Sequence, residues 1–436
     1  MRALRAAIFL YRLLWWPALP LLLGYLWLRG RRDPAYRRHW AERFGGGPVL
    51  PNAVWVHAVS LGEMRSAVLL VRALLAQGER VVTTHLTPAG RRAAEDAFAT
   101  DIAAGRLVAR YLPLETHHAW ARLLRRARPK LVLALEIEIW PGMIAALDRA
   151  GVPLALVNSQ VPGRSMPRAE RLARSLGHPV ALVPLVLAKS DRHAVRFRTL
   201  GAPYVKVCGE LRFDQPVPTA QTTAAAALRK DLTRPVVTLA SVVAGEEALY
   251  LDALAQLRDR LALPPLAVWV PRAPELFDAT AERLSAAGLR VVRRSTMLDA
   301  DLHTSAPDPL ADTDVLLGDS FGEMFFYLAL GDAAVVGGGF VPKGAHNIIE
   351  PLALGRPVLV GPHVWTIEYP GEEAMAAGVV TLCRDATDLA TALAARLGPN
   401  PETQAAMKAF LADHKGATER TLAALAPWLE DTKKCD

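Results

Sequence analysis

Short apolar runs alternate with helical segments along most of the chain. Because a buried parallel strand is a nearly continuous apolar run, this rhythm predicts doubly wound parallel sheets. We therefore expect an α/β protein with two Rossmann-like domains that bind ligands beyond the carboxyl ends of their strands. The predicted strands are 54–59, 80–84, 107–111, 131–135, 152–157 and 182–188 in the first half, and 236–240, 267–270, 289–292, 315–317, 333–336, 358–360 and 379–382 in the second.

A stretch rich in Pro, Thr and Ala separates the two halves and reads as a linker with a lead-in helix. The chain of 436 residues is long enough for two domains, since a domain typically has about 100 to 200 residues. The C-terminal segment is predicted to form a pair of amphipathic helices that packs back on the two domains. The predicted parts are an anchor at 1–30, a first domain at 31–214, the linker at 215–234, a second domain at 235–400 and the C-terminal helices at 401–436.

The segment 6–28 is almost wholly apolar and has arginines on both sides. Its length is marginal for a membrane span of about 20 residues, and Pro17 and Pro20 would kink a helix there. An Arg-rich stretch follows where a signal peptide would have a small-residue cleavage site, so we expect an uncleaved membrane anchor. A helix that spans the membrane and a helix that lies in its interface both fit this pattern.

Composition narrows the class of protein. Hydrophobic residues make up 52% and charged residues 22% of the chain, which is typical of a globular protein. Cys208, Cys383 and Cys435 are scattered without metal-ligand spacing, so we expect neither a disulfide framework nor a structural zinc. The net charge of +8 fits nucleic acid, anionic lipid or an acidic substrate. No zinc finger, basic helix or aromatic and basic platform appears, which disfavours nucleic acid.

The segment 337–351 follows a predicted strand with three glycines and then polar side chains. A strand that runs into a glycine turn and a helix start leaves backbone N–H groups free for a phosphate or carboxylate. Asn347 and Glu350 are one helical turn apart, and Glu350 could accept hydrogen bonds from a sugar diol. The alternative is purely structural: the glycines turn the chain, and Asn347 and Glu350 cap a helix.

Two acidic positions follow strands of the first half. Glu63 lies in the first turn of a predicted helix beside Gly62, where burial could make it a general base for a hydroxyl group. Its structural alternative is a favourable interaction with the helix dipole. Glu136 and Glu138 are two residues apart, so in an extended segment they would face the same way and form an acidic wall or a cation site. Capping the next helix or pairing with arginine remains open for each.

These motifs, in their order and spacing, resemble the bacterial Kdo transferases. Those enzymes are membrane-anchored glycosyltransferases of the GT-B type, which move 3-deoxy-D-manno-octulosonic acid (Kdo) from CMP-Kdo to the lipid A precursor. No Walker P-loop or GxGxxG motif competes with this assignment. Besides the anchor, the matching segments are 42–45, 60–63, 136–141, 318–323, 337–340, 346–351 and 361–363.

The resemblance implies an inverting transferase of lipopolysaccharide biosynthesis, on the cytoplasmic face of the inner membrane. It implies a phosphorylated glycolipid acceptor, a nucleotide-sugar donor, no nucleic-acid partner, and no cofactor or metal. Glu63 matches the catalytic base that deprotonates the acceptor hydroxyl. The implied acceptor-side residues are Ser60, Gly62, Glu136 and Glu138, and the implied donor-binding residues are Ser190, Arg212, Ser241, Arg272, Gly338, Gly339, Phe340, His346, Asn347 and Glu350.

The chain also departs from the family pattern at positions expected to touch substrates. Polar residues of the family are replaced at Val242, Val243 and Ala244, a histidine at Ala273, an arginine at Gln160 and an asparagine at Glu210. Changes at hydrogen-bonding positions can alter substrate preference strongly. One alternative is therefore a related glycosyltransferase with another nucleotide sugar or another lipid acceptor. A second is a non-catalytic, membrane-associated binding protein on the same scaffold.

Overall fold

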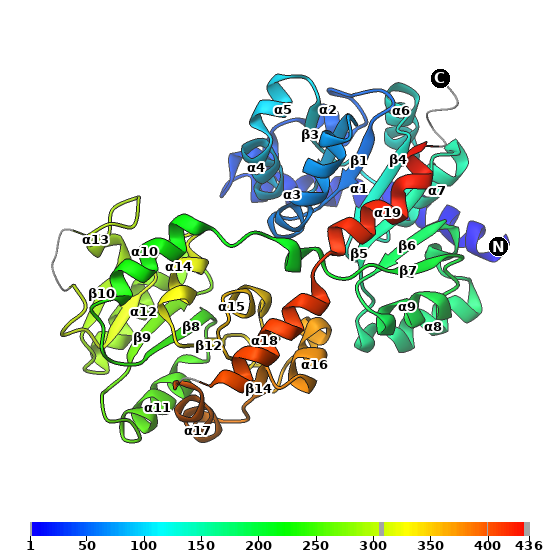
Figure 1. Ribbon diagram of the computed structural model, residues 1–436. Coiled ribbons are helices and arrows are strands. Elements are labelled where there is room, and N and C mark those ends of the chain that lie inside the picture. The colour runs from blue at the N-terminus through cyan, green and yellow to red at the C-terminus, as the bar shows by residue number, and fades with distance from the viewer. Residues whose placement is uncertain (1, 305–308, 399, 431–436) are drawn as a thin grey trace. The chain divides into compact units, whose positions relative to one another are not determined.

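The computed structural model describes residues 2–304, 309–398 and 400–430 (Figure 1). The chain divides into two compact units, Met1–Gln215 with Gly416–Asp436, and Pro216–Lys415. Each unit is built on a parallel sheet with helices packed on both faces. This confirms the predicted α/β class with two doubly wound sheets.

In the described residues, the sheet of the first unit has seven parallel strands in the order β3-β2-β1-β4-β5-β6-β7. The order reverses between β1 and β4, and ligands of such sheets bind beyond the strand ends at this point. The edge strand β7 lies outside the predicted apolar runs because it is short and not buried. The strands are β1 (Val54–His57), β2 (Val81–His85), β3 (Leu107–Tyr111), β4 (Leu131–Leu135), β5 (Leu154–Ser159), β6 (Leu185–Ala188) and β7 (Val205–Val207).

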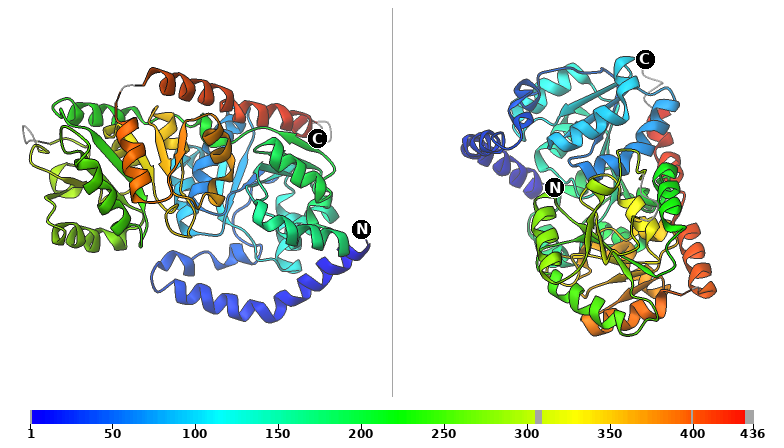
Figure 2. Two further views of the ribbon diagram at one scale, coloured as in Figure 1. Left: turned by 90° about the horizontal axis from the view of Figure 1, so that it is seen from below. Right: turned by 90° about the vertical axis from the view of Figure 1, so that its left-hand side faces the viewer.

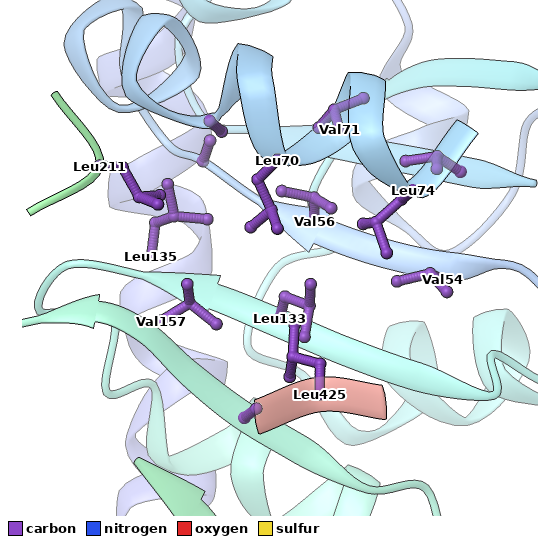
Figure 3. Packing of buried hydrophobic residues seen from close by; sticks show 14 of the residues in the cluster. Val54, Val56, Leu70, Val71, Leu74, Leu133, Leu135, Val157, Leu211 and Leu425 are labelled. Carbon is purple, nitrogen blue, oxygen red and sulfur yellow. The ribbon is translucent and has the colours of Figure 1, made fainter. Parts of the chain in front are cut away.

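Alternate residues of these strands face two separate cores. Val54 and Val56 of β1 pack against one set of helices, whereas Trp55 packs against the other set. Figure 3 shows the first core, where Leu425 from the C-terminal end of the chain points toward Leu133 of β4. The helices of the first core are α3 (Leu61–Ala76), α4 (Pro88–Ala97) and α19 (Ala417–Glu430), and those of the second are α6 (His117–Ala127), α7 (Pro141–Ala150), α8 (Met166–Ser175) and α9 (Asp191–Thr199).

The second unit repeats this plan. Its sheet has seven parallel strands among the described residues, in the order β10-β11-β9-β8-β12-β13-β14. The strands are β8 (Val236–Val242), β9 (Leu266–Pro271), β10 (Val291–Arg293), β11 (Val315–Leu317), β12 (Ala333–Val336), β13 (Val358–Val360) and β14 (Val380–Leu382). The helices include α10 (Thr219–Arg229), α11 (Glu247–Arg258), α12 (Phe277–Ala286), α14 (Met324–Leu330), α15 (Ile349–Ala353), α16 (Glu368–Ala376), α17 (Ala386–Arg396) and α18 (Pro401–His414).

The chain passes between the units twice. In the segment 215–234, expected as linker and lead-in helix, α10 packs on α14 as part of the second unit. The segment 401–436, expected as one helix pair, is divided: α18 belongs to the second unit and α19 to the first. The Asp214 carboxylate fixes the start of α19, because it accepts hydrogen bonds from the backbone N–H groups of Gly416 and Thr418, each at 2.6 Å.

The predicted anchor is one helix, α1 (Arg2–Arg29), which continues through Pro17 and Pro20. Its length and composition would allow it to cross a membrane, although a signal sequence near an N-terminus meets the same criteria. The helix packs against α7 and against a short 3-10 turn at Pro34–Arg37. Figure 2 shows it lying along one side of the first unit.

Candidate active site

Glu63 lies in the first turn of α3, at the carboxyl end of β1. Ser60 is the N-cap of this helix, and its hydroxyl oxygen accepts a hydrogen bond from the Glu63 N–H at 3.4 Å. The Glu63 carboxylate turns back and accepts a hydrogen bond from the Val59 N–H at 2.6 Å. Gly62 is exposed, and the nearest atom to a Cβ built there would be Ser60 Oγ at 4.0 Å. The capping residues therefore hold a carboxylate beside an accessible turn.

The surroundings of Glu63 give this carboxylate a high proton affinity. Burial raises the pKa of Glu63 to about 8, and the negative charges of Glu138 and Glu136 contribute to the rise. The hydrogen bonds from Val59 and Ser60 act in the opposite direction. A carboxyl group with this pKa can accept and release a proton near neutral pH, as a general base requires.

Glu138 links Glu63 to a buried histidine. The Glu138 carboxylate lies 3.6 Å from Nε2 of His57, and it also accepts a hydrogen bond from the Trp140 indole. The other ring nitrogen of His57, Nδ1, lies 2.9 Å from the Thr84 hydroxyl. His57 Nε2 is buried and has no hydrogen-bond partner among the described residues, so its polar contact with Glu138 is an electrostatic one at 3.6 Å.

The Glu136 carboxylate has different hydrogen-bond partners from the Glu138 carboxylate. The backbone of Glu136 is left-handed, with φ of 58°, so the segment is a turn and not extended. The Glu136 carboxylate accepts hydrogen bonds from Asn158 Nδ2 at 3.0 Å, Gln160 Nε2 at 3.1 Å and Lys189 Nζ at 2.6 Å. The expected extended segment, on which Glu136 and Glu138 would face the same way, is therefore wrong, and the two carboxylates have different partners.

The Lys189 ammonium joins Glu136 to a second buried carboxylate. Lys189 Nζ lies 2.7 Å from Glu210, which is 0% exposed, and Arg212 Nε lies 3.2 Å from the same carboxylate. Burial alone would raise the pKa of Glu210, but the charges of Arg212 and Lys189 hold it well below its usual range. Asn158 Nδ2 also donates to Glu210 at 3.0 Å. We call Glu136, Lys189, Glu210 and Arg212 the ion cluster.

Two of the departures from the family pattern come together at the ion cluster. Glu210 is a member of the cluster, and Gln160 donates a hydrogen bond to another member, Glu136. Arg212, an expected donor-binding residue, is held by Glu210 within the first unit. Ser190 also belongs to the first unit, where its hydroxyl is the N-cap of α9 and accepts from His193 N–H at 3.5 Å. The remaining expected donor-binding residues lie in the second unit.

In the second unit, one buried carboxylate organises the glycine turn that follows β12. Glu246 is 0% exposed, and its Oε1 accepts hydrogen bonds from Gly338 N–H at 2.7 Å and Phe340 N–H at 3.1 Å. Its Oε2 accepts from Val243 N–H at 3.2 Å. The expectation that these N–H groups are free for an anion is wrong at Gly338 and Phe340, because Glu246 occupies them.

The glycines of this turn are required by close packing. Gly338 has φ of +87°, and a Cβ there would overlap the carbonyl oxygen of Gly344. A Cβ on Gly339 would come within 2.8 Å of the Gly361 backbone nitrogen. The Phe340 ring packs edge-on against Tyr250 at 5.6 Å between ring centroids. This side chain is therefore part of the hydrophobic core as well as of the turn.

Positive charge gathers beside this turn. Burial lowers the pKa of His346 to about 4, and the charges of Arg272 and Lys343 add to the effect. The neutral His346 ring has a buried Nε2 that lacks a hydrogen-bond partner among the described residues. Arg272 is exposed at the end of β9, and its N–H donates to the Val242 carbonyl at 2.8 Å. Ser241 lies on the neighbouring strand with φ of 58°.

Asn347 precedes the short helix α15 and turns the chain into it. Its side-chain oxygen accepts a hydrogen bond from Ile349 N–H at 3.0 Å, whereas the N-cap position itself is Ile348. Glu350 is in the first turn of α15 and half-buried. The alternative that Asn347 caps this helix is therefore wrong, because the N-cap is Ile348 and no side chain caps it. Asn347 instead forms a local turn, and this bond leaves its side-chain amide NH₂ group as a donor.

Sequence reasoning missed several residues that shape both sites: Lys189, His57, Asn158 and Glu246. Their signal was weak: His57, Asn158 and Lys189 stand near the ends of apolar runs, and Glu246 lies in the loop after β8. A buried polar residue at a strand end needs a partner, and this rule could have marked Lys189. Within the described residues, no cluster of three or more His, Cys, Asp or Glu side chains could hold a metal ion.

Comparisons with known proteins identify close relatives. Residues 38–215 match the family described as 3-deoxy-D-manno-octulosonic-acid transferase (kdotransferase). A 3-deoxy-D-manno-octulosonic acid transferase of Bordetella pertussis is 39% identical over 94% of this chain and 96% of its own length. The enzyme of that name from Haemophilus influenzae is 30% identical over the same shares. A glycosyltransferase structure from Rickettsia africae is similar in fold, with a TM-score of 0.57 and 11% identity over 87% of this chain and 98% of its own.

Proposed function

The chain belongs to the Kdo transferase family, and from this premise we propose that it moves Kdo from CMP-Kdo to a hydroxyl group of a lipid A precursor. It is a glycosyltransferase with two doubly wound sheets. The proposal adds the nucleotide donor, the lipid acceptor and the inverting mechanism. The observation that carries it is Glu63, a carboxyl group whose pKa is raised to about 8 beside an exposed turn.

In the proposed reaction, the acceptor hydroxyl loses its proton to the Glu63 carboxylate as its oxygen attacks the anomeric carbon of the donor. The bond from that carbon to the CMP phosphate oxygen breaks in the same step, so the configuration inverts. Cytidine monophosphate leaves with the bonding electrons. Glu138 favours the step because its charge raises the pKa of Glu63.

The second unit supplies the groups for the nucleotide in this proposal. Arg272 provides an exposed guanidinium for phosphate, and the neutral His346 ring offers a buried nitrogen with no other partner among the described residues. Asn347 and Glu350 are proposed to contact the ribose or base, and Ser241 the phosphate. Gly338, Gly339 and Phe340 act through the shape of the turn, since Glu246 occupies two of its N–H groups.

The proposed location is the inner membrane, with both units on its cytoplasmic face. Helix α1 supports this location through its length and its exposed apolar side chains. The net charge of +8 favours an acidic glycolipid as acceptor. The proposal requires no nucleic acid, metal or cofactor besides the donor substrate.

The test is to incubate the purified protein with CMP-Kdo and a lipid A precursor and to measure the mass of the product lipid by mass spectrometry. A mass increase of one or more Kdo residues is expected, together with release of CMP. The protein with Glu63→Gln serves as the control for background transfer. Absence of any Kdo-bearing product, with transfer from another nucleotide sugar, would reject this donor.

A second candidate is a related transferase that uses another nucleotide sugar, one without a carboxylate. Glu210 favours it, because this carboxylate sits within the ion cluster and neutralises Lys189 and Arg212. An arginine engaged in this way offers less positive charge to the carboxylate of a sugar. A panel of CMP-linked and UDP-linked sugars in the same assay separates the two candidates.

A further inference from the structure

A groove between α6 and α7 presents a concentration of basic side chains on the first unit. Its volume is about 470 Å³. No acidic side chain is among the described residues that line it, which are His117, Ala121, Leu124, Arg125, Arg128, Ala146, Arg149 and Ala150. The floor is apolar and the rim is basic, which fits a ligand with an anionic group and an adjoining apolar part.

Arginines from two other elements meet at His117. Its Nδ1 lies 3.3 Å from Nη2 of Arg12 on α1 and 3.4 Å from Nη1 of Arg149 on α7. Burial lowers the pKa of His117, and the charges of Arg12 and Arg149 lower it further. The imidazole is therefore neutral at pH 7 and does not add a third positive charge between the two guanidinium groups.

The nearby acidic side chains are engaged elsewhere. Asp148 lies 3.9 Å from Arg5 on α1. Glu115 accepts hydrogen bonds from Gly142 N–H at 2.6 Å and from the Trp120 indole at 3.1 Å. Within residues 2–304, 309–398 and 400–430, neither Arg125 nor Arg149 forms an ion pair with an acidic side chain. The positive charge of the groove is thus uncompensated by the unit itself.

Helix α1 runs beside this groove and is attached to the unit near both of its ends. Near its start, Arg5 Nη2 lies 3.9 Å from the Asp148 carboxylate of α7. Near its middle, the Tyr11 hydroxyl donates to Glu115 at 3.4 Å, and the Trp16 ring lies 5.8 Å from the His118 ring. Near its end, the Trp27 carbonyl accepts from Arg37 Nη2 at 2.9 Å. The opposite face is apolar and exposed, with Phe9, Leu10, Leu13, Leu14, Leu21 and Leu28. A helix attached in this way lies along a membrane surface, because spanning would draw the attached unit into the hydrocarbon.

We propose that α1 lies flat in the membrane interface and that the groove beside it binds the phosphate of an anionic phospholipid headgroup. A guanidinium group can donate two parallel hydrogen bonds to the oxygens of one phosphate. Arg125 of α6 and Arg149 of α7 supply two guanidinium groups at this groove. The acyl chains of the lipid then extend toward the apolar face of α1. The proposal rests on the membrane association proposed above, but not on the identity of the sugar or the acceptor.

The test is sedimentation of the full chain with vesicles of phosphatidylcholine alone or with added phosphatidylglycerol, without donor or acceptor. The variant with Arg125→Gln and Arg149→Gln is compared with a matched variant, Arg65→Gln and Arg72→Gln, which removes the same charge from α3 on the other face of the sheet. Each arginine of the groove is expected to contribute about five-fold to the affinity for anionic vesicles. The α3 variant is expected to bind as the unaltered chain does.

Two results would overturn the proposal: equal losses in both variants, or unchanged binding in the groove variant. A charge-conserving pair, Arg125→Lys and Arg149→Lys, keeps the general attraction but removes the paired hydrogen bonds, and intermediate binding is expected. If inorganic phosphate binds the chain through these arginines while vesicle binding does not depend on them, the ligand is a free phosphate and the lipid assignment is wrong. A failed sugar-transfer assay with intact vesicle binding would count against the proposed function only.

Discussion

The Glu246 carboxylate accepts the N–H of Gly338 at 2.7 Å, so a fully buried side chain fixes the turn that follows β12. The same oxygen accepts from Phe340 at 3.1 Å. The glycine turn is therefore already occupied by an acidic group of the chain. This relationship changes the chemistry expected of the turn, because a buried carboxylate repels a phosphate placed directly on the same backbone.

Replacing Glu246 with glutamine is expected to destabilise the second unit. The glutamine carries one acceptor oxygen and an NH₂ group, so at least one of the three backbone N–H groups loses its acceptor. An unsatisfied buried donor costs about 1–3 kcal/mol. Urea unfolding followed by circular dichroism measures the loss, with the exposed Glu275→Gln as the matched control. Equal stability of the two variants would contradict the structural role.

Gly338→Ala is expected to be more damaging than most alanine substitutions. The backbone at +87° disfavours any side chain by roughly 1–2 kcal/mol, and the added Cβ overlaps the Gly344 carbonyl. Gly398→Ala is the control, because nothing lies within 4 Å of a Cβ at that position. Thermal unfolding should show a clear decrease in Tm for the first variant and almost no change for the second.

Glu63→Gln is expected to lower kcat by about 10²–10⁴-fold, the usual contribution of a general base. In the unaltered enzyme the base acts only when deprotonated. With the pKa raised to about 8, kcat/KM should rise with pH and level off above this value. The residual kcat/KM of the variant should not show this rise with pH. A variant with an unchanged rate would show that Glu63 is not the base.

Glu138→Gln tests the coupling between the acidic residues. Its charge raises the pKa of Glu63, so its removal should shift the midpoint of the kcat/KM profile to lower pH. The variant therefore keeps more of its base deprotonated at pH 7. A profile that does not move would mean that the two carboxylates do not interact during catalysis.

The ion cluster should make the first unit sensitive to acid. The folded pKa of Glu210 is depressed by Arg212 and Lys189, so its charged form stabilises the fold. That stabilisation is present above the unfolded pKa of about 4.3 and is lost as the pH falls toward the lower folded value. Glu210→Gln should remove this part of the acid dependence, whereas Glu419→Gln on the exposed face of α19 should not. Urea unfolding at several pH values measures both.

The sheets were predictable from sequence because buried parallel strands form apolar runs that hardly depend on context. The strand at 54–59 is an example: its core, Val54–His57, is β1. The edge strand β7 escaped prediction because its side chains are only partly buried. The helix α19 was expected to pack on the body, but its assignment to the first unit depends on Asp214, some 200 residues away in sequence, as the bonds to Gly416 and Thr418 show.

The site was predictable to a lesser degree. Ser60 and Glu63 follow a local capping pattern, so their positions came from the sequence. The partners of Glu136 did not, because its left-handed backbone reversed the direction expected from residue spacing. The occupied N–H groups of the glycine turn were equally hidden, since Glu246 lies more than ninety residues before them. Long-range pairing of buried charges is a tertiary property that short motifs do not encode.

The return of the chain to the first unit has a consequence for biosynthesis. Ala417, Leu425 and Leu429 of α19 belong to the same core as Val54 and Leu133. During translation, these residues emerge only after the whole second unit, Pro216–Lys415, has been made. The first unit therefore exposes this apolar surface until α19 has been synthesised. A chaperone would be needed most at this stage of synthesis.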